Sequence, residues 1–154
     1  SLNASANTAL SYKSSNRNIA TVSSSGKVTV KNPGKAVITI SSAGNSNYTK
    51  AAAVSVELNV RLKKPVIRVK ATGRKVARIT PVTKTPGAEG YETWVLNPGK
   101  SKYTKLGIAS SEKKYFRFVG AKGKTYKVKV RACRKVSGKY VYSSFSSVKS
   151  VKIK

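Results

Sequence analysis

The stretch that decides the fold reads Thr125-Tyr-Lys-Val-Lys-Val-Arg-Ala132 and, shortly afterwards, Ser137-Gly-Lys-Tyr-Val-Tyr142. Apolar and cationic residues alternate in its first part, and this period of two indicates a β-strand with one buried face. The apolar set that starts at Tyr126 would face the core, and the cationic set that starts at Lys127 would face outward. Gly138 can adopt positive φ in a tight turn, so the two parts are predicted to form a β-hairpin.

Short alternating runs of the same kind recur along the whole chain, and signals for helices are nearly absent. Gly, Pro, Ser and Asn separate the runs, which is typical of a β-sandwich or a β-barrel. The strands predicted in this way are 9–12, 20–22, 27–31, 36–41, 53–60, 66–70, 76–80, 91–96, 103–108, 114–118, 125–136 and 140–154. The sequence therefore predicts an all-β protein.

A composition change near the middle of the chain divides it into two domains. The segment Arg61-Leu-Lys-Lys-Pro65 contains a proline, which cannot donate to a β-ladder and which biases the preceding residue to an extended conformation. We therefore predict domains at 1–60 and 65–154 with a short, stiff linker at 61–64. The first domain is small for a sandwich and starts abruptly in strand-like sequence, so we expect it to lack an N-terminal strand.

The composition argues against an enzyme. The 154 residues include no His and no Asp, and the four acids are Glu57, Glu89, Glu92 and Glu112. Without His the usual general base near neutral pH is missing, and no Ser-His-Asp arrangement can form. Zinc would need Cys or His ligands, and calcium sites usually use several carboxylates. We expect no catalytic residues, no metal site and no cofactor.

The charge balance is strongly basic, with 32 Lys and Arg against four acids and a net charge of +28. Such a field attracts polyanions and keeps a chain soluble, but it does not determine the fold. Candidate partners are nucleic acid, anionic cell-wall polymers, sulfated or sialylated glycans, and acidic membrane surfaces. The alternative is that the scattered charge only keeps the protein soluble beside an anionic wall.

Cysteine use and hydropathy limit the cellular setting. Cys133 is the only cysteine, so no internal disulfide can form and the domains must be held by packing. This pattern fits a cytosolic protein, and it also fits the cysteine-poor extracellular proteins of Gram-positive bacteria. No apolar run approaches the ~20 residues of a membrane-spanning helix.

Residues 10–40 resemble the group 2 bacterial immunoglobulin-like family. The resemblance rests on Leu10-Ser-Tyr-Lys-Ser-Ser-Asn16, on Ala20-Thr-Val22, on the turn at Gly26, and on Gly34-Lys-Ala-Val-Ile38. In that family an aromatic residue precedes Ser-Ser-Asn, and Tyr12 takes this place.

Residues 65–154 resemble a fibronectin type III domain. The resemblance rests on 87–92, on 123–132 and on 144–153, and it makes Tyr126 the residue of a tyrosine corner, whose hydroxyl bonds to upstream backbone. The usual tryptophan of the second strand is missing. Pro81 lies in this region, and because it cannot donate to a ladder we expect an altered or bulged strand there.

The two resemblances imply two immunoglobulin-like β-sandwiches in tandem, as in surface proteins of Gram-positive gut bacteria. They also imply a secreted or cell-surface module without catalytic activity that acts as a spacer or in adhesion. The alternatives are a specific binder of anionic glycan or cell-wall polymer, or of a protein ligand, and, with less support, a nucleic-acid-binding protein. The basic residues do not interleave with aromatic ones as an RNA-binding platform requires, so we expect no specific nucleic acid, and we expect a monomer.

The candidate binding patch consists of Trp94, Lys127, Lys129 and Arg131. Period two places all four on the outer face of one sheet, where an acidic sugar could stack on the ring and meet the cations. We expect the Trp94 ring to lie beneath Arg131 or Lys129, and Glu92 to pair with a neighbouring cation. The alternative is that the aromatic residues of this region serve only as cross-strand pairs.

Overall fold

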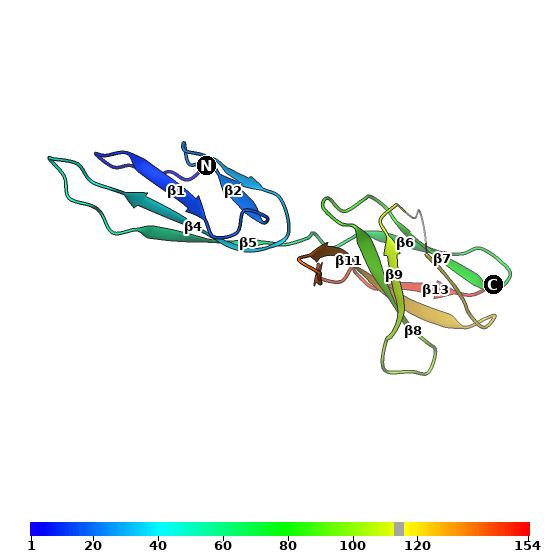
Figure 1. Ribbon diagram of the computed structural model, residues 1–154. Helices are drawn as coiled ribbons and strands as arrows, with labels where there is room; N and C mark the ends of the chain where they lie inside the picture. The colour runs from blue at the N-terminus through cyan, green and yellow to red at the C-terminus, as the bar shows by residue number, and fades with distance from the viewer. Residues whose placement is uncertain (113–115) are drawn as a thin grey trace. The chain divides into compact units, whose positions relative to one another are not determined.

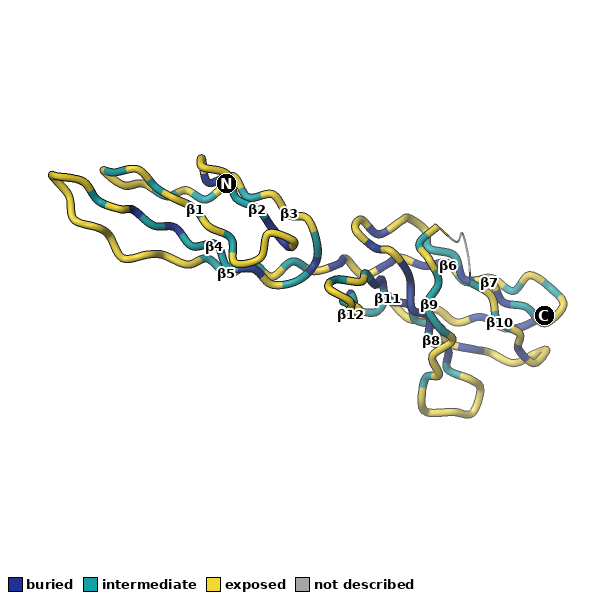
Figure 2. The backbone as a smooth tube through the Cα atoms, in the orientation of Figure 1, coloured by how far each residue is buried: buried dark blue, intermediate teal, exposed yellow. Residues whose placement is uncertain are grey.

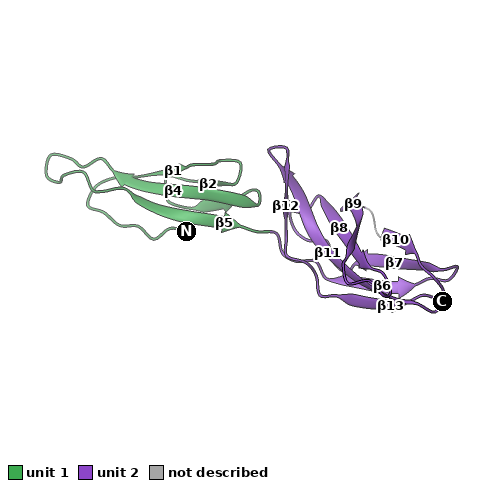
Figure 3. Cartoon of the chain, turned by 90° about the horizontal axis from the view of Figure 1, so that it is seen from below, with its two compact units in different colours: residues 1–61 green, residues 62–154 purple. Residues whose placement is uncertain are grey.

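A computed structural model describes residues 1–112 and 116–154, and in these residues the chain is all-β, as predicted. The chain forms two compact units, residues 1–61 and 62–154 (Figure 3). No helix in the described part is long and apolar enough to cross a membrane. The two units are described separately below.

The first unit contains five strands in two sheets (Figure 1). Its strands are β1 (Leu10–Ser14), β2 (Ala20–Val22), β3 (Val28–Val30), β4 (Gly34–Ser42) and β5 (Val54–Val60). The larger sheet has the order β1-β4-β5, and β2 and β3 form an antiparallel hairpin. The long central strand β4 alternates buried and half-buried residues, with Ala36, Ile38 and Ile40 facing the core.

The residues that carry the resemblance in the first unit have structural roles. Ser15 binds the backbone of Val37 twice. The Ser15 N–H donates to the Val37 carbonyl at 2.8 Å, and the Ser15 Oγ accepts from the Val37 N–H at 2.8 Å. Gly26 has φ of 75°, and a Cβ there would lie 3.1 Å from the Tyr12 ring. The Tyr12 ring and the turn at Gly26 therefore pack against each other.

The second unit is a sandwich of two antiparallel sheets. Its strands are β6 (Ile67–Ala71), β7 (Val76–Pro81), β8 (Gly90–Leu96), β9 (Thr104–Ser110), β10 (Phe116–Val119), β11 (Thr125–Val136), β12 (Lys139–Tyr142) and β13 (Lys149–Lys152). One sheet has the order β10-β7-β6, and the other has the order β12-β11-β8-β9 with β13 also paired to β11. The predicted strand 114–118 starts in residues outside the described ones, and β10 occupies its described part.

The core of the second unit lies between these sheets, and alternation of buried and exposed residues is visible along the strands (Figure 2). The buried side chains come from both sheets and include Ile67, Ile79, Tyr91, Val95, Val128, Val130 and Ile153. Leu62, which falls in the predicted linker, is 7% exposed and belongs to this core.

The tyrosine corner is present, as the resemblance implied. The Ala121 N–H donates to the Tyr126 hydroxyl at 2.8 Å, and the Tyr126 ring is 8% exposed. Gly120 is needed beside it, because a Cβ at this position would lie 2.7 Å from the ring. The buried Tyr91 makes a similar bond, which the sequence did not predict: the Thr85 N–H donates to its hydroxyl at 2.8 Å.

The expected irregularity at Pro81 is wrong in position. β7 pairs with β6 without a register shift up to its last residue, Pro81, and beyond it the Val82 N–H still donates to the Val66 carbonyl at 2.8 Å. The bulge lies instead between β8 and β9, where Thr93 is opposite Gly107 and Trp94 is opposite Lys105. Gly107 has φ of 137°, which glycine adopts without strain.

Candidate functional site: the outer face of the β8-β11 sheet

Register between β8 and β11 positions the candidate patch. Trp94 lies directly opposite Lys129, and Glu92 lies directly opposite Arg131. Tyr91, Thr93 and Val95 are at most 2% exposed, and these inward residues alternate with Glu92 and Trp94. The outer face thus brings a ring, an acid and cations from two neighbouring strands together.

Glu92 is the centre of this face. Its side chain is 1% exposed, although it lies on the side of the sheet that faces away from the core. Lys105 Nζ is 2.7 Å from Oε1, Arg131 Nε donates to Oε2 at 2.5 Å, and Trp94 Nε1 donates to Oε2 at 2.8 Å. The prediction that Glu92 pairs with a neighbouring cation is confirmed, and it pairs with two.

These donors keep Glu92 ionised. Burial, the largest single effect, raises the pKa, but the hydrogen bonds from Arg131, Lys105 and Trp94 together outweigh it and lower the pKa of Glu92 to about 2. The same contact raises the pKa of Lys105 above its ordinary value. Glu92 therefore does not suit general acid catalysis, which needs a carboxyl that is protonated near neutral pH.

Cations and aromatic rings alternate across the same face. Arg131 lies 3.7 Å from the centre of the Tyr142 ring and 5.0 Å from that of Phe145. Lys129 Nζ lies 4.3 Å from the centre of the Phe145 ring and 4.2 Å from that of Tyr103. The order Tyr142, Arg131, Phe145, Lys129, Tyr103 is a continuous stack of cation–π contacts.

The expectation that a cation covers Trp94 is wrong. Among the described residues no Lys or Arg lies over its ring, which instead meets the edge of Phe145 at 6.2 Å between ring centres. Phe145 comes from the segment after β12 and occupies the place beside Lys129 that the sequence assigned to Trp94. The indole N–H is bound to Glu92, which fixes the orientation of the ring.

Two serines attach the segment 143–148 to β11. Ser143 donates its N–H to the Ala132 carbonyl at 2.9 Å and accepts the Ala132 N–H on Oγ at 2.9 Å. Ser146 does the same with Val130, at 2.7 and 3.1 Å. The predicted continuous strand 140–154 is therefore wrong. β12 pairs with one end of β11 and β13 pairs with the other end. Between them, the two serines form the hydrogen bonds to the β11 backbone.

We call Glu92, the cation–π stack and the two serines the clasp. It holds together β8, β9, β11 and the segment 143–148, which are far apart in sequence. Sequence reasoning missed Lys105 and Phe145, although Glu92 stood out as a rare acid at an outward position among cations.

The clasp uses most of the groups that the candidate patch would offer to a ligand. Arg131 and Trp94 bind Glu92, Lys129 contacts two rings, and Lys127 is exposed. The assignment of these four residues as a ligand site stays a prediction. In the described parts of the chain, no three His, Cys, Asp or Glu side chains lie close enough to hold a metal ion.

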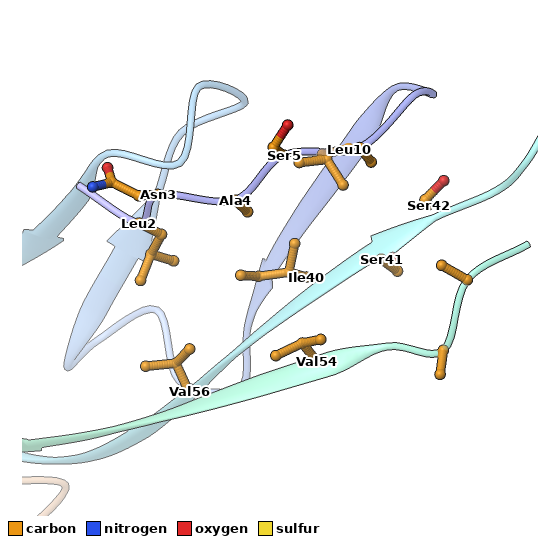
Figure 4. Close-up of a pocket in the computed structure, with 13 residues that line it drawn as sticks. Leu2, Asn3, Ala4, Ser5, Leu10, Ile40, Ser41, Ser42, Val54 and Val56 are labelled. Carbon is orange, nitrogen blue, oxygen red and sulfur yellow. The ribbon is translucent and has the colours of Figure 1, made fainter.

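The first unit contains an apolar groove of about 410 Å³. Leu2, Ile40, Val54 and Val56 turn their side chains into the space between the N-terminal segment and the β4-β5 pair (Figure 4). Only apolar, Ser and Asn side chains line it, so it offers no acid–base or ion-pairing chemistry.

Comparison with known proteins supports both halves of the fold. The family model of the intimin immunoglobulin-like domain matches residues 2–44. The sequence resemblance named the group 2 family, and the match is to this other immunoglobulin-like family. No curated protein sequence matches the chain.

Solved structures show the same fold. A two-domain fibronectin type III segment from chicken tenascin is similar with a TM-score of 0.60 at 12% identity, over 93% of this chain and 82% of that one. A β-1,2-glucanase from Parabacteroides distasonis has a TM-score of 0.50 at 18% identity, over 77% of this chain and 17% of the glucanase. The chain is a tandem of an immunoglobulin-like and a fibronectin type III-like β-sandwich.

Proposed function

We propose that this chain forms non-catalytic domains of a bacterial cell-surface protein, which act outside the cell as spacers or adhesive modules. Immunoglobulin-like and fibronectin type III-like sandwiches suggest an adhesive or structural module without catalysis. The match to the intimin immunoglobulin-like domain supports a bacterial surface protein. The fold alone does not assign a function, so the proposal also needs support from the residues.

The observation that carries the proposal is the clasp. On the outer face of the β8-β11 sheet, the buried acid Glu92 binds Lys105 and Arg131, and Arg131 and Lys129 contact three aromatic rings. Their contacts join distant segments, which is what a domain without a disulfide needs in order to resist unfolding outside the cell. The chain has one cysteine, Cys133, and it is fully buried.

The partners that fit this proposal are anionic cell-wall polymers, acidic glycans or a protein ligand, with the chain itself a monomer. The net charge of +28 favours association with anionic surfaces.

Labelling of cells tests the location. Antibodies raised against the chain are expected to label intact, unpermeabilised cells of the source bacterium, and protease added outside should remove the label. Labelling that appears only after permeabilisation would contradict the proposal.

A further inference from the structure

The outer face of the β10-β7-β6 sheet carries a row of cations. Ile67, Ala77 and Ile79 point into the core, so the residues between them point outward. The outward cationic side chains, which we call the basic face, are Arg68, Lys70, Arg78 and Arg117, and all four are exposed. The described residues of these three strands include no acid.

Register places three of these cations side by side. Lys70 lies directly opposite Arg78, and Arg78 lies directly opposite Arg117. Because neighbouring strands are ~4.8 Å apart, the row crosses the sheet within about 10 Å. Like charges that are directly opposite each other in a sheet destabilise it. The row therefore gives this face of the sheet a dense positive charge.

The second sheet of the same unit treats its cations differently. The ion pairs among the described residues are those of Lys105 and Arg131 with Glu92, and of Arg134 with Glu89. None of these pairs involves Arg68, Lys70 or Arg117. The two acids that form these pairs, Glu89 and Glu92, thus neutralise cations of the second sheet only.

The cationic surface continues into the β6-β7 turn. Arg74 and Lys75 are exposed there with φ of 49° and 62°, a conformation that costs energy for residues other than glycine. Hydrogen bonds from Val76 N–H to the Gly73 carbonyl and from Gly120 N–H to the Lys75 carbonyl fix the backbone of this turn.

We propose that the basic face binds a linear anionic polysaccharide, whose sulfate or carboxylate groups lie across β6, β7 and β10. Arginine guanidinium groups bind such groups through two parallel hydrogen bonds. The face is an open sheet surface, and its described outward residues include no aromatic ring that could stack on nucleic-acid bases. The binding surface does not depend on the cellular location proposed above.

A charge-matched pair of variants tests this assignment in the full chain, with heparin as the probe at 0.15 M salt. The variant R68Q/K70Q/R117Q removes three of the four positive charges of the basic face and leaves Arg78 in place. We expect its dissociation constant for heparin to rise about tenfold, because three exposed ion pairs with the polymer are lost and each of them contributes modestly to binding. The control K139Q/K149Q/K152Q removes the same charge from exposed positions on β12 and β13, and its dissociation constant should change less than about threefold.

The outcomes separate a site from a general field. An equal loss in the two triple variants would overturn the proposal, because only net charge would then matter. Duplex DNA of equal charge concentration that displaces heparin as well as heparin itself does would overturn the polysaccharide assignment. The variant R68K/R117K keeps the charge and the fold but not the two-bond geometry, and we expect it to bind heparin more weakly than the original chain.

Discussion

At the scale of single residues, Glu92 shows how an acid can be buried on the outer side of a sheet. A carboxylate taken out of water without partners would become protonated or destabilise the fold. Here three donors from β8, β9 and β11 surround it, and Phe145 packs against the Trp94 ring beside it. The result is a carboxylate that stays charged and acts as a link between strands.

Replacement of Glu92 by Gln should destabilise the second unit by about 2–4 kcal/mol at neutral pH, because Arg131 and Lys105 lose the charge that they share. The control is Glu89→Gln, since Glu89 is exposed, lies 3.4 Å from Arg134, and accepts the Lys135 N–H at 3.1 Å, a bond that the amide oxygen of Gln can keep. Its cost should stay below about 1 kcal/mol. Urea denaturation of both variants measures these free energies of unfolding. Equal effects would mean that the clasp does not stabilise the second unit.

The pH dependence of stability follows from the same acid. The pKa of Glu92 is about 2 in the folded chain and 4.5 in an unfolded one, so between these values the unfolded state binds more protons. The contribution of about 3 kcal/mol is complete above pH 5 and is lost as the pH falls towards 2. Stability curves of the original chain and of Glu92→Gln should therefore converge at low pH. Parallel curves would show that Glu92 is not ionised in the fold.

Tyr126→Phe should cost on the order of 1–3 kcal/mol, because the half-buried hydrogen bond from the Ala121 N–H loses its acceptor. Tyr140→Phe is the matched control, since Tyr140 is 48% exposed and should change little. Thermal melting measures both. An unchanged midpoint for Tyr126→Phe would contradict the hydrogen bond.

Predictions about single residues succeeded where the alternation of inward and outward side chains along a strand, or a local motif, determines where a residue lies. Period two placed Trp94 on the outer face, and the burial of its neighbours Thr93 and Val95 agrees with this. The corner at Tyr126 followed from the resemblance. The partner of Lys129 could not be predicted, because Phe145 arrives from a segment whose path depends on the hydrogen bonds of two serines.

At the scale of elements, β11 organises the second unit. It is the longest strand, it pairs with β8 along one edge, and it pairs with both β12 and β13 along the other. Between the last two, Ser143 and Ser146 satisfy the backbone of β11 with their own N–H and Oγ groups. The sequence predicted the β11-β12 hairpin from its turn. The break after Tyr142 was missed, because serine side chains that bind β11 in place of a paired strand leave no periodic signal in the sequence.

The double variant S143A/S146A should destabilise the second unit by about 2–4 kcal/mol, because each change leaves a buried N–H of β11 without an acceptor. The control is S144A/S147A, which changes the exposed serines of the same segment and should be nearly neutral. Hydrogen exchange of the Val130 and Ala132 amides provides the readout. If these amides exchange equally slowly in both variants, the serines do not hold the segment.

At the scale of the whole chain, the two units differ in how much core they contain. Among the described residues, nineteen apolar ones are buried, of which five lie in the first unit and fourteen in the second. The first unit also leaves Val54 59% exposed beside its apolar groove. Since a small unit buries a smaller share of its surface, we expect the first unit to be the less stable one.

Thermal unfolding should therefore show two transitions, of which the lower belongs to the first unit. The only tryptophan, Trp94, lies in the second unit, so its fluorescence should report only the upper transition, whereas far-ultraviolet circular dichroism should report both. Acidification from pH 5 to pH 3 should lower the upper midpoint more, because the buried carboxylate Glu92 is there and the one acid of the first unit, Glu57, is exposed. One coincident transition in both signals, or an acid shift confined to the lower transition, would show that stability is not divided between the units in this way.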